Sequence, residues 1–203
     1  EKVSWDPDLE LNANESVCLA IEETGTGVKV HVAWPDWSRN YVYNGQPYNY
    51  YGTKIFYKYR DTAGVWSPAE VVSSESNKPA GHPSIAVDIN GRVHIAWVDH
   101  TDFPPDDTDS NSGNSDIVYK CRDPISGWLT GPGATEVVSS ESTENAGGPS
   151  LDLGLNGSVV HIAWHDYSTL PNVIDIDYGG NTYPDIFYKW KYTGGPWSNP
   201  TEL

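Results

Sequence analysis

The sequence contains no methionine, only three phenylalanines and two cysteines, and few basic residues. Twelve Lys and Arg residues oppose 28 Asp and Glu residues, for a formal net charge of −16. This negative charge repels phosphate backbones and anionic lipid head groups, so we expect no nucleic-acid partner and no membrane-surface role. No run of 18 apolar residues occurs, so no membrane insertion is predicted. The missing methionine, even at position 1, predicts a processed product or an excised segment.

The two cysteines, Cys18 and Cys121, have no spacing typical of a metal site or a disulfide framework, and we interpret both as small core residues. Nine Trp and 13 Tyr residues form most of the aromatic content. Both side chains join a large apolar face to a polar group. This balance is typical of extracellular β proteins that bind sugars, although core packing also explains much of it. We therefore expect an extracellular or cell-surface location.

Internal repetition dominates the sequence. The phrase VHVAWPD at 30–36 returns as VHIAWVD at 93–99 and VHIAWHD at 160–166. A long polar segment follows each copy, and then comes a second phrase: KIFYK at 54–58, DIVYK at 116–120 and DIFYK at 185–189. A Gly-containing turn closed by Trp66, Trp128 or Trp197 comes next. The remaining phrases are EVVS at 70–73 and 136–139, then PSIAVD at 83–88 and PSLDL at 149–153.

Each phrase is four to seven residues long, rich in β-branched and aromatic side chains, and bounded by Gly, Pro, Asn or Asp. That pattern is typical of β-strands, and no helical period competes with it. The sequence therefore predicts an all-β fold made of three antiparallel repeats of four strands, A to D. The repeats form one array over 1–203, with units at about 16–74, 83–140 and 149–203.

These phrases, in this order, resemble the repeats of the sialidase-like (Asp-box, BNR-type) β-propeller superfamily. The resemblance implies that each repeat is a propeller blade with strand A at the axis and strand D outside. In that family an Asp box, Ser-x-Asp-x-Gly-x-Thr-Trp, forms the C-to-D turn. Residues 60–66 match it in part, 122–128 match it less, and 192–197 lack the Asp. The boxes are degenerate, so the resemblance implies a non-catalytic member and supports the fold more than any activity.

The two ends of the chain align with the two halves of one outer strand. Residues 2–4 align with 71–73, and the chain stops at 200–203. We expect residues 1–4 to complete an outer strand, a device that removes an exposed sheet edge. Three blades are fewer than the usual four to eight. Three arrangements stay open: two copies form a six-bladed ring, copies polymerise, or the remaining blades belong to a longer chain.

The long segments between strands B and C, at 36–53, 99–115 and 166–184, should lie on one edge of the array and carry any function. Two of them alternate Asp with Asn near Gly, which suits the oxygen ligands of Ca²⁺, the one cofactor that we predict; a solvated acidic loop with Asx turns is the alternative. The candidate calcium ligands are Asp107, Asp109, Asn111, Asp116, Asp175, Asp177, Asn181 and Asp185.

Aromatic residues in the same segments suggest glycan binding, because aromatic rings stack on sugars while nearby amides and carboxylates bond to hydroxyls. The alternative is that these rings pack the loops together. The candidate ligand-binding residues are Trp37, Tyr41, Tyr43, Tyr48, Tyr50, Tyr51, Tyr167, Tyr178 and Tyr183. Two Asn-x-Ser motifs make Asn14 and Asn156 candidate N-glycosylation sites of an exported protein.

Residues that recur in every repeat are interpreted as structural, because a single active site needs different residues from different blades. Three Asp residues are expected to cap the B-to-C segments, and three His residues are expected to be buried and hydrogen-bonded. They are Asp36, Asp99 and Asp166, and His31, His94 and His161. By contrast, His82, His100 and His165 do not recur, so they are freer to be functional.

A sialidase clamps its substrate carboxylate with three Arg side chains that converge on one point. This chain has only Arg39, Arg60, Arg92 and Arg122, and the last three are expected at the edge away from the long segments. We therefore predict a non-enzymatic extracellular propeller protein, a structural or self-assembling subunit with carbohydrate binding through the long segments. The alternatives are a lectin-like module and a glycoside hydrolase or lyase-type propeller enzyme.

Overall fold

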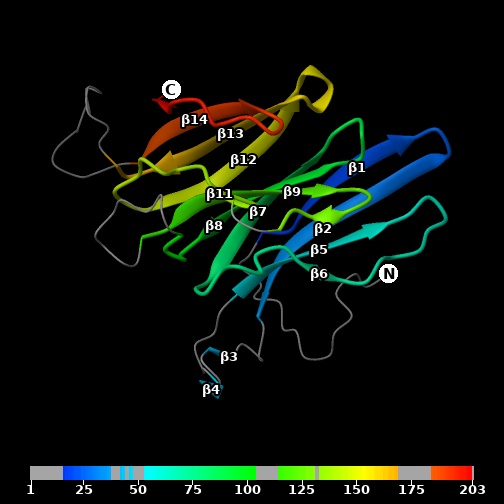
Figure 1. Ribbon diagram of the computed structural model, residues 1–203, viewed down its shortest axis with the longest axis horizontal. Helices are drawn as coiled ribbons and strands as arrows, with labels where there is room; N and C mark the ends of the chain where they lie inside the picture. Colours follow the sequence, from blue (N-terminus) through cyan, green and yellow to red (C-terminus); the bar gives the residue numbers. More distant parts are fainter. Residues whose placement is uncertain are drawn as a thin grey trace.

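The protein is all-β, as the sequence predicts. The computed structural model describes residues 16–37, 42–43, 46–47, 53–103, 114–130, 133–168 and 184–202. Three antiparallel sheets follow one another along the chain and lie side by side (Figure 1). We call them sheet 1, sheet 2 and sheet 3.

Each sheet is a meander in which consecutive strands pair. Sheet 1 contains β1 (Cys18–Thr24), β2 (Gly27–Trp37), β5 (Thr53–Arg60) and β6 (Glu70–Val71). Sheet 2 contains β7 (Ala80–Val87), β8 (Val93–Asp99) and β9 (Asp116–Asp123), with β10 (Gly127–Trp128) and β11 (Thr135–Val137) both paired to β9. Sheet 3 contains β12 (Ala146–Gly154), β13 (Val159–Asp166), β14 (Asp185–Tyr192) and β15 (Thr201–Glu202).

The register of the first two strands is the same in all three sheets. Cys18 pairs with Ala33, Ser84 with Ala96 and Ser150 with Ala163. Residues at equal distances from these pairs are therefore structurally equivalent, and one sheet can be compared with another position by position.

Two first strands begin three residues before the expected Pro83 and Pro149, because each opens with a β-bulge. The register shifts between Gly81 and Ser84 in β7, and between Gly147 and Ser150 in β12. The bulge places His82 at φ 50° and its equivalent Gly148 at φ 59°. Only glycine adopts this left-handed conformation without steric cost, so the sequence of β12 suits the bulge better than that of β7.

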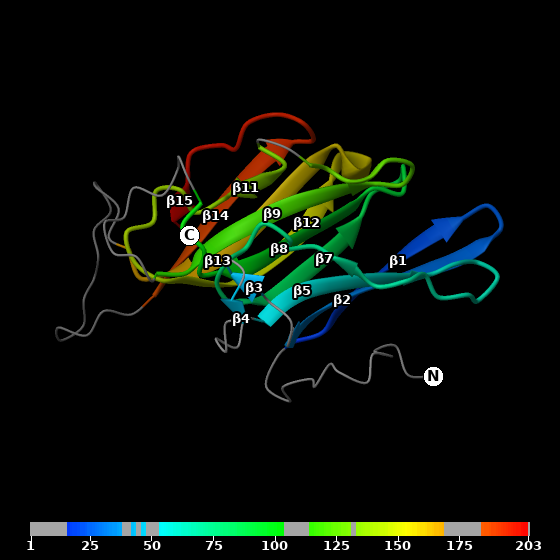
Figure 2. The same ribbon diagram turned by 60° about the horizontal axis from the view of Figure 1, so that its bottom comes forward.

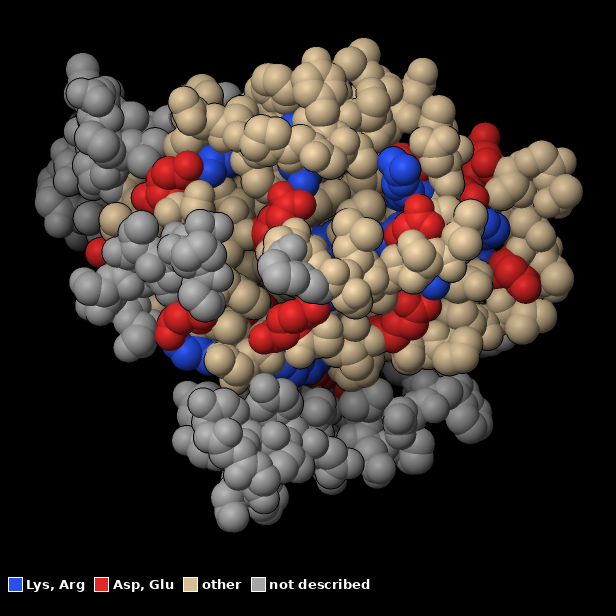
Figure 3. Space-filling model, viewed as in Figure 1, with Lys and Arg blue, Asp and Glu red and all other residues tan. Residues whose placement is uncertain are grey.

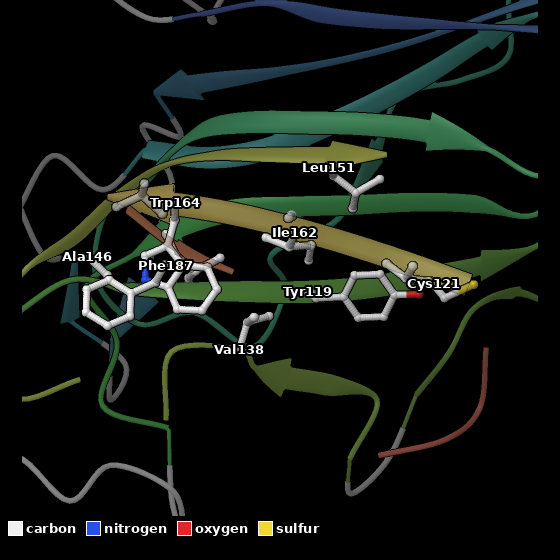
Figure 4. Close-up of a cluster of buried hydrophobic side chains, with 12 residues drawn as sticks. Tyr119, Cys121, Val138, Ala146, Leu151, Ile162, Trp164 and Phe187 are labelled. Atoms are coloured by element: carbon white, nitrogen blue, oxygen red, sulfur yellow. The ribbon is translucent and has the colours of Figure 1, made fainter. Parts of the chain in front are cut away.

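The hydrophobic core lies between the sheets. Sheet 2 is covered on both faces, and its second strand β8 is buried along its whole length. One cluster joins sheets 1 and 2 through residues such as Ile55, Tyr57 and Ile85, and an equivalent cluster joins sheets 2 and 3. In the second cluster Leu151 and Ile162 of sheet 3 lie over Tyr119 of sheet 2 (Figure 4). Figure 2 shows the same stack of sheets from a second side.

The segment after β2 contains structure that the sequence does not predict. Two short strands, β3 (Val42–Tyr43) and β4 (Gln46–Pro47), form a separate ribbon, and Trp37 ends β2 opposite Thr53. A 3₁₀ turn, η1 (Leu155–Gly157), joins β12 to β13. No helix among the described residues is long and apolar enough to cross a membrane.

Candidate functional site

At the edge where the second strands end, a buried carboxylate repeats in each sheet. The indole nitrogens of Trp34, Trp97 and Trp164 donate to Asp36, Asp99 and Asp166, at 3.2, 2.7 and 3.0 Å. All three carboxylates are buried, and burial raises the pKa of Asp99. The Asp99 and Asp166 carboxylates also accept the backbone N–H two residues later, at 2.9 and 2.8 Å. Asp99 and Asp166 thus cap the ends of the second strands, as the sequence predicts. Residue 38, the equivalent position after Asp36, lies outside the described residues.

The same carboxylates hold the linkers between sheets. Ser76 and Ser142, in the linkers that lead to sheets 2 and 3, donate their hydroxyls to Asp99 and Asp166. The hydroxyl of Ser168 accepts hydrogen bonds from two backbone N–H groups of the second linker, at 2.7 and 3.0 Å. The hydroxyl of Thr101 likewise accepts hydrogen bonds from two backbone N–H groups of the first linker. This edge therefore fastens each sheet to the next.

At the opposite edge, a histidine of the second strand and a tyrosine of the third strand bond in every sheet. The imidazole Nδ1 atoms of His31, His94 and His161 lie 2.7, 2.7 and 2.6 Å from tyrosine hydroxyls, those of Tyr57, Tyr119 and Tyr188 respectively. The first strand adds a carboxylate in sheets 1 and 2, and Gly154 occupies its position in sheet 3. A carboxylate, an imidazole and a hydroxyl in a row resemble catalytic hydrogen-bond relays in composition.

Burial governs the chemistry of this row. A carboxylate oxygen of Glu22 lies 3.1 Å from His31 Nε2, within hydrogen-bond distance. A carboxylate oxygen of Asp88 lies 3.8 Å from His94 Nε2, and that nitrogen has no hydrogen-bond partner within the described residues. Burial lowers the pKa of both histidines, that of His94 to about 4, so both are neutral at pH 7. It also raises the pKa of Tyr57. His31 and His94 are buried and hydrogen-bonded, as the sequence predicts. His161 is hydrogen-bonded too but only half-buried, because no sheet among the described residues follows sheet 3 over its outer face.

Ion pairs cross from each outer strand and linker to the third strand of the next sheet. Lys120 donates to both carboxylate oxygens of Glu75 at 2.8 Å, and Arg122 pairs with Glu70 at 2.9 Å. Lys189 pairs with Glu141 and Lys191 with Glu136 at the equivalent positions of sheet 3. Accordingly, acidic and basic side chains alternate on the face in Figure 3 instead of forming one patch of either sign.

An aromatic contact accompanies these ion pairs. Trp128 of sheet 2 packs edge to face on Tyr57 of sheet 1, and Trp197 of sheet 3 packs in the same way on Tyr119 of sheet 2. Both pairs have ring centroids 5.4 Å apart, within the range that favours this geometry. The turn-closing tryptophans are therefore residues of the interface between neighbouring sheets.

The two outer faces of the stack expose residues whose equivalents are buried elsewhere. On sheet 1, Leu19 is 62% exposed, whereas its equivalents Ile85 and Leu151 are 8% exposed. On sheet 3, Ile186 is 47% exposed, whereas its equivalents Ile55 and Ile117 are fully buried. Ile21 extends the exposed face of sheet 1 at 58% exposure, and Trp190 extends that of sheet 3 at 38% exposure. Trp34 of sheet 1, by contrast, is buried. Large apolar surfaces of this kind mark sites of association.

Two of the predicted calcium ligands lie among the described residues. Asp116 and Asp185 begin β9 and β14, and the Asp116 carboxylate accepts a hydrogen bond from Ser139 at 2.7 Å. Asp107, Asp109, Asn111, Asp175, Asp177 and Asn181 lie outside the described residues. Within the described residues, no three His, Cys, Asp or Glu side chains are grouped to hold a metal ion. The calcium prediction therefore stays a prediction.

Tyr167 is the predicted ligand-binding aromatic whose side chain the structure describes. It is 41% exposed and packs edge to face on His165. For Trp37 and Tyr43 the structure describes the strand positions alone, and Tyr41, Tyr48, Tyr50, Tyr51, Tyr178 and Tyr183 lie outside the described residues. Of the candidate glycosylation sites, Asn14 also lies outside them, and Asn156 is exposed in the 3₁₀ turn at φ 58°.

The predicted nature of the cysteines agrees with their surroundings. Both thiols are free, Cys121 lies in the core between sheets 2 and 3, and Cys18 packs against the other core cluster. Burial raises the pKa of Cys18 to about 12 and that of Cys121 to about 11. Neither thiol is therefore a reactive nucleophile at neutral pH.

Sequence reasoning missed the residues that join the sheets. The heptapeptide EVVSSES occurs at 70–76 and again at 136–142. Its two glutamates, at the first and sixth positions, and its last serine all contact the next sheet. That exact repeat is the signal that indicates an interface. The chain matches no protein-family model, and no curated protein gives a significant match to it.

Proposed function

We propose that the protein is a non-enzymatic, self-assembling structural module whose three sheets are consecutive blades of a sialidase-like β-propeller. The strand order supports the blade assignment, because each sheet is a four-stranded meander apart from the added β10. The equivalent packing of sheet 1 on sheet 2 and of sheet 2 on sheet 3 supports it as well.

One observation carries the self-assembly. The outer face of sheet 3 exposes the residue type that sheets 1 and 2 bury against a following sheet, and the outer face of sheet 1 exposes the residue type that sheets 2 and 3 bury against a preceding one. The two faces are complementary parts of one repeated interface. Association through different patches on the two partners is head to tail.

Light scattering coupled to gel filtration over a range of concentrations tests this function. Association through the outer faces predicts a mass that rises from the 22.4 kDa of one chain to that of an assembly. A mass of one chain at every concentration would refute self-assembly. Turnover assays on glycoside substrates test the enzymatic alternative, for which we expect no activity.

Glycan binding is the second candidate function. It would take place at the edge where the second strands end and the long B-to-C segments begin. The exposed ring of Tyr167, held against His165, favours it, because a partly exposed and fixed aromatic ring is the element that stacks on a sugar. A glycan array read with and without Ca²⁺ tests both this idea and the calcium prediction. Silence in both conditions would contradict glycan binding. For an exported protein, N-linked glycan at Asn156 is expected, and peptide mass mapping detects it.

A further inference from the structure

The interface between sheets is built from paired residues, and one pair is left open at the two ends of the stack. Tyr57 and Tyr119 each receive a tryptophan from the following sheet. The equivalent residue of sheet 3, Tyr188, is half-buried and bonds to His161, and within the described residues no tryptophan lies on its ring. The tyrosine face that would receive a tryptophan is therefore present, and no described tryptophan fills it.

The tryptophan that would fill it is at the other end of the chain. The backbones of Trp66 and Arg60 form an isolated antiparallel β-bridge in sheet 1. The backbones of Trp128 and Arg122 pair in the equivalent way in sheet 2. Within the described part of the chain, Trp66 makes no contact with an aromatic ring. Its indole nitrogen is enclosed without a hydrogen-bond partner, as are those of Trp128 and Trp197. Trp66 thus shares the enclosed indole nitrogen of the other two tryptophans, but no described tyrosine ring lies against it.

Apolar side chains surround both open positions. Ile186 and Trp190 flank Tyr188 along β14, and they are 47% and 38% exposed. Leu19 and Ile21 lie on β1 of the sheet that carries Trp66, and they are 62% and 58% exposed. In the two interfaces inside the chain, the equivalents of these four side chains pack against one another.

The number of sheets indicates how many copies take part. Propellers usually have four to eight blades, and two copies of three sheets give six, whereas three copies give nine. A head-to-tail contact closes into a ring when its rotation divides a full turn. Two copies therefore satisfy both outer faces with a blade number in the usual range.

We infer that two copies of this chain close head to tail into a six-sheet ring, in which Trp66 of each copy packs edge to face on Tyr188 of the other. The inference rests on the proposed self-assembly and adds to it the partner, the stoichiometry and the central contact. The occupant of both outer faces is a second copy of the same chain.

The test compares variants by sedimentation velocity and light scattering. Wild-type protein is expected to be a dimer. Trp66→Ala and Tyr188→Ala should each raise the dissociation constant at least about 30-fold, since central aromatic residues contribute about 2 kcal/mol or more to interfaces. Leu19→Asp and Ile186→Asp change exposed side chains and should also give monomers without unfolding the chain. Ile125→Ala, which removes a side chain 96% exposed at a turn of sheet 2, is the control and should stay dimeric.

Mixing experiments establish the head-to-tail orientation. Leu19→Asp protein retains an intact sheet 3 face, and Ile186→Asp protein retains an intact sheet 1 face. An equimolar mixture of the two monomers should therefore form a heterodimer with one wild-type interface. A mixture that stays monomeric would overturn the head-to-tail contact.

The remaining outcomes separate this inference from the proposed function. A monomeric wild-type chain overturns both and leaves further repeats of a longer chain as the occupant of the faces. Assemblies that keep growing with concentration support self-assembly but overturn the closed ring of two copies. A dimer that Leu19→Asp disrupts and that Trp66→Ala and Tyr188→Ala leave unchanged overturns the Trp66–Tyr188 contact. Far-ultraviolet circular dichroism of each variant confirms that a loss of dimer is not a loss of fold.

Discussion

Trp128 packs edge to face on Tyr57 across the boundary between sheets 2 and 1, with the ring centroids 5.4 Å apart. The guanidinium of Arg122 lies 5.6 Å from the same tyrosine ring, and it pairs with Glu70 of sheet 1. Aromatic packing, a cation over a ring and an ion pair thus converge on one tyrosine. The joint between sheets is therefore expected to contribute a large share of the stability of the fold.

Removing this tryptophan tests that expectation. Trp128→Ala should lower the free energy of unfolding by about 3 kcal/mol, because a large side chain is lost from a packed contact and leaves a cavity. Chemical denaturation measures the change. The neighbouring Leu129→Ala removes a side chain that is 47% exposed and should cost less than about 0.5 kcal/mol. Equal losses for the two variants would contradict the importance of the joint.

The ion pair between Lys120 and Glu75 should respond asymmetrically to substitution. The Lys120 side chain is 1% exposed, so Glu75→Gln leaves a buried ammonium with a weaker partner and should cost about 1–2 kcal/mol. Replacing both residues, with Glu75→Gln and Lys120→Met, should recover most of that loss because no buried charge remains. Thermal and urea unfolding compare the variants. A double variant less stable than Glu75→Gln would contradict this explanation.

The buried imidazole of His94 makes the fold sensitive to acid. Its pKa is about 4 in the folded protein, compared with an ordinary value of 6.5, so the unfolded chain binds the proton more tightly. The free energy of unfolding should therefore fall as the pH drops from about 6.5 to about 4, by up to about 3 kcal/mol from this residue. Urea unfolding at several pH values measures the slope.

His94→Gln is the matched variant for that experiment. It should show a shallower fall over the same pH range, although some fall remains because burial also lowers the pKa of His31. An unchanged slope in His94→Gln would show that His94 is not the group responsible.

The bulge at the start of β7 offers a stabilising substitution. His82 adopts φ 50°, where its equivalent in β12 is Gly148, so His82→Gly removes a steric cost of about 1–2 kcal/mol. The greater entropy of glycine in the unfolded chain offsets part of this gain, and a net increase of about 0.5 kcal/mol is expected. The reverse change, Gly148→His, should destabilise, because a Cβ there lies 3.0 Å from the His165 ring. Opposite signs for the two variants are the expected result of thermal unfolding.

The main strands were predictable because their phrases recur, although β7 and β12 begin three residues before the expected boundary. The structural roles of Asp99 and His94 also followed from repetition, since a residue present in every repeat serves the repeat. The ribbon of β3 and β4 was not predictable, because it occurs once and its strands are two residues long.

The exact repeat of EVVSSES indicates an interface, but the sequence does not indicate which residues it contacts on the next sheet. Lys120 and Glu75 are 45 residues apart, and nothing in either phrase indicates which face of one sheet meets which face of the next. The bulges were missed for a related reason, since a shift in the register of two paired strands is a property of the pairing and not of either phrase alone. The contacts between sheets and the bulges both depend on how strands and sheets are aligned in space, which the composition of a phrase does not determine.

Asp152 distinguishes the proposed ring from a general tendency to associate. It is exposed on β12 at the position of Ala20 and Ala86, both of which pack against the core clusters between sheets. A carboxylate at that position opposes burial. Asp152→Ala should therefore lower the dissociation constant of the dimer. Asp123→Ala, at a turn of sheet 2 away from both outer faces, is the control and should not lower it. Sedimentation of the two variants at equal concentration measures the difference.

In the proposed ring, the outer faces of sheets 1 and 3 are two halves of one interface. Light scattering of the wild-type chain and of the equimolar mixture of Leu19→Asp and Ile186→Asp is the decisive measurement. Such an interface predicts twice the 22.4 kDa mass of one chain in both samples and monomers for each variant alone. A wild-type chain that stays monomeric at every concentration would contradict it.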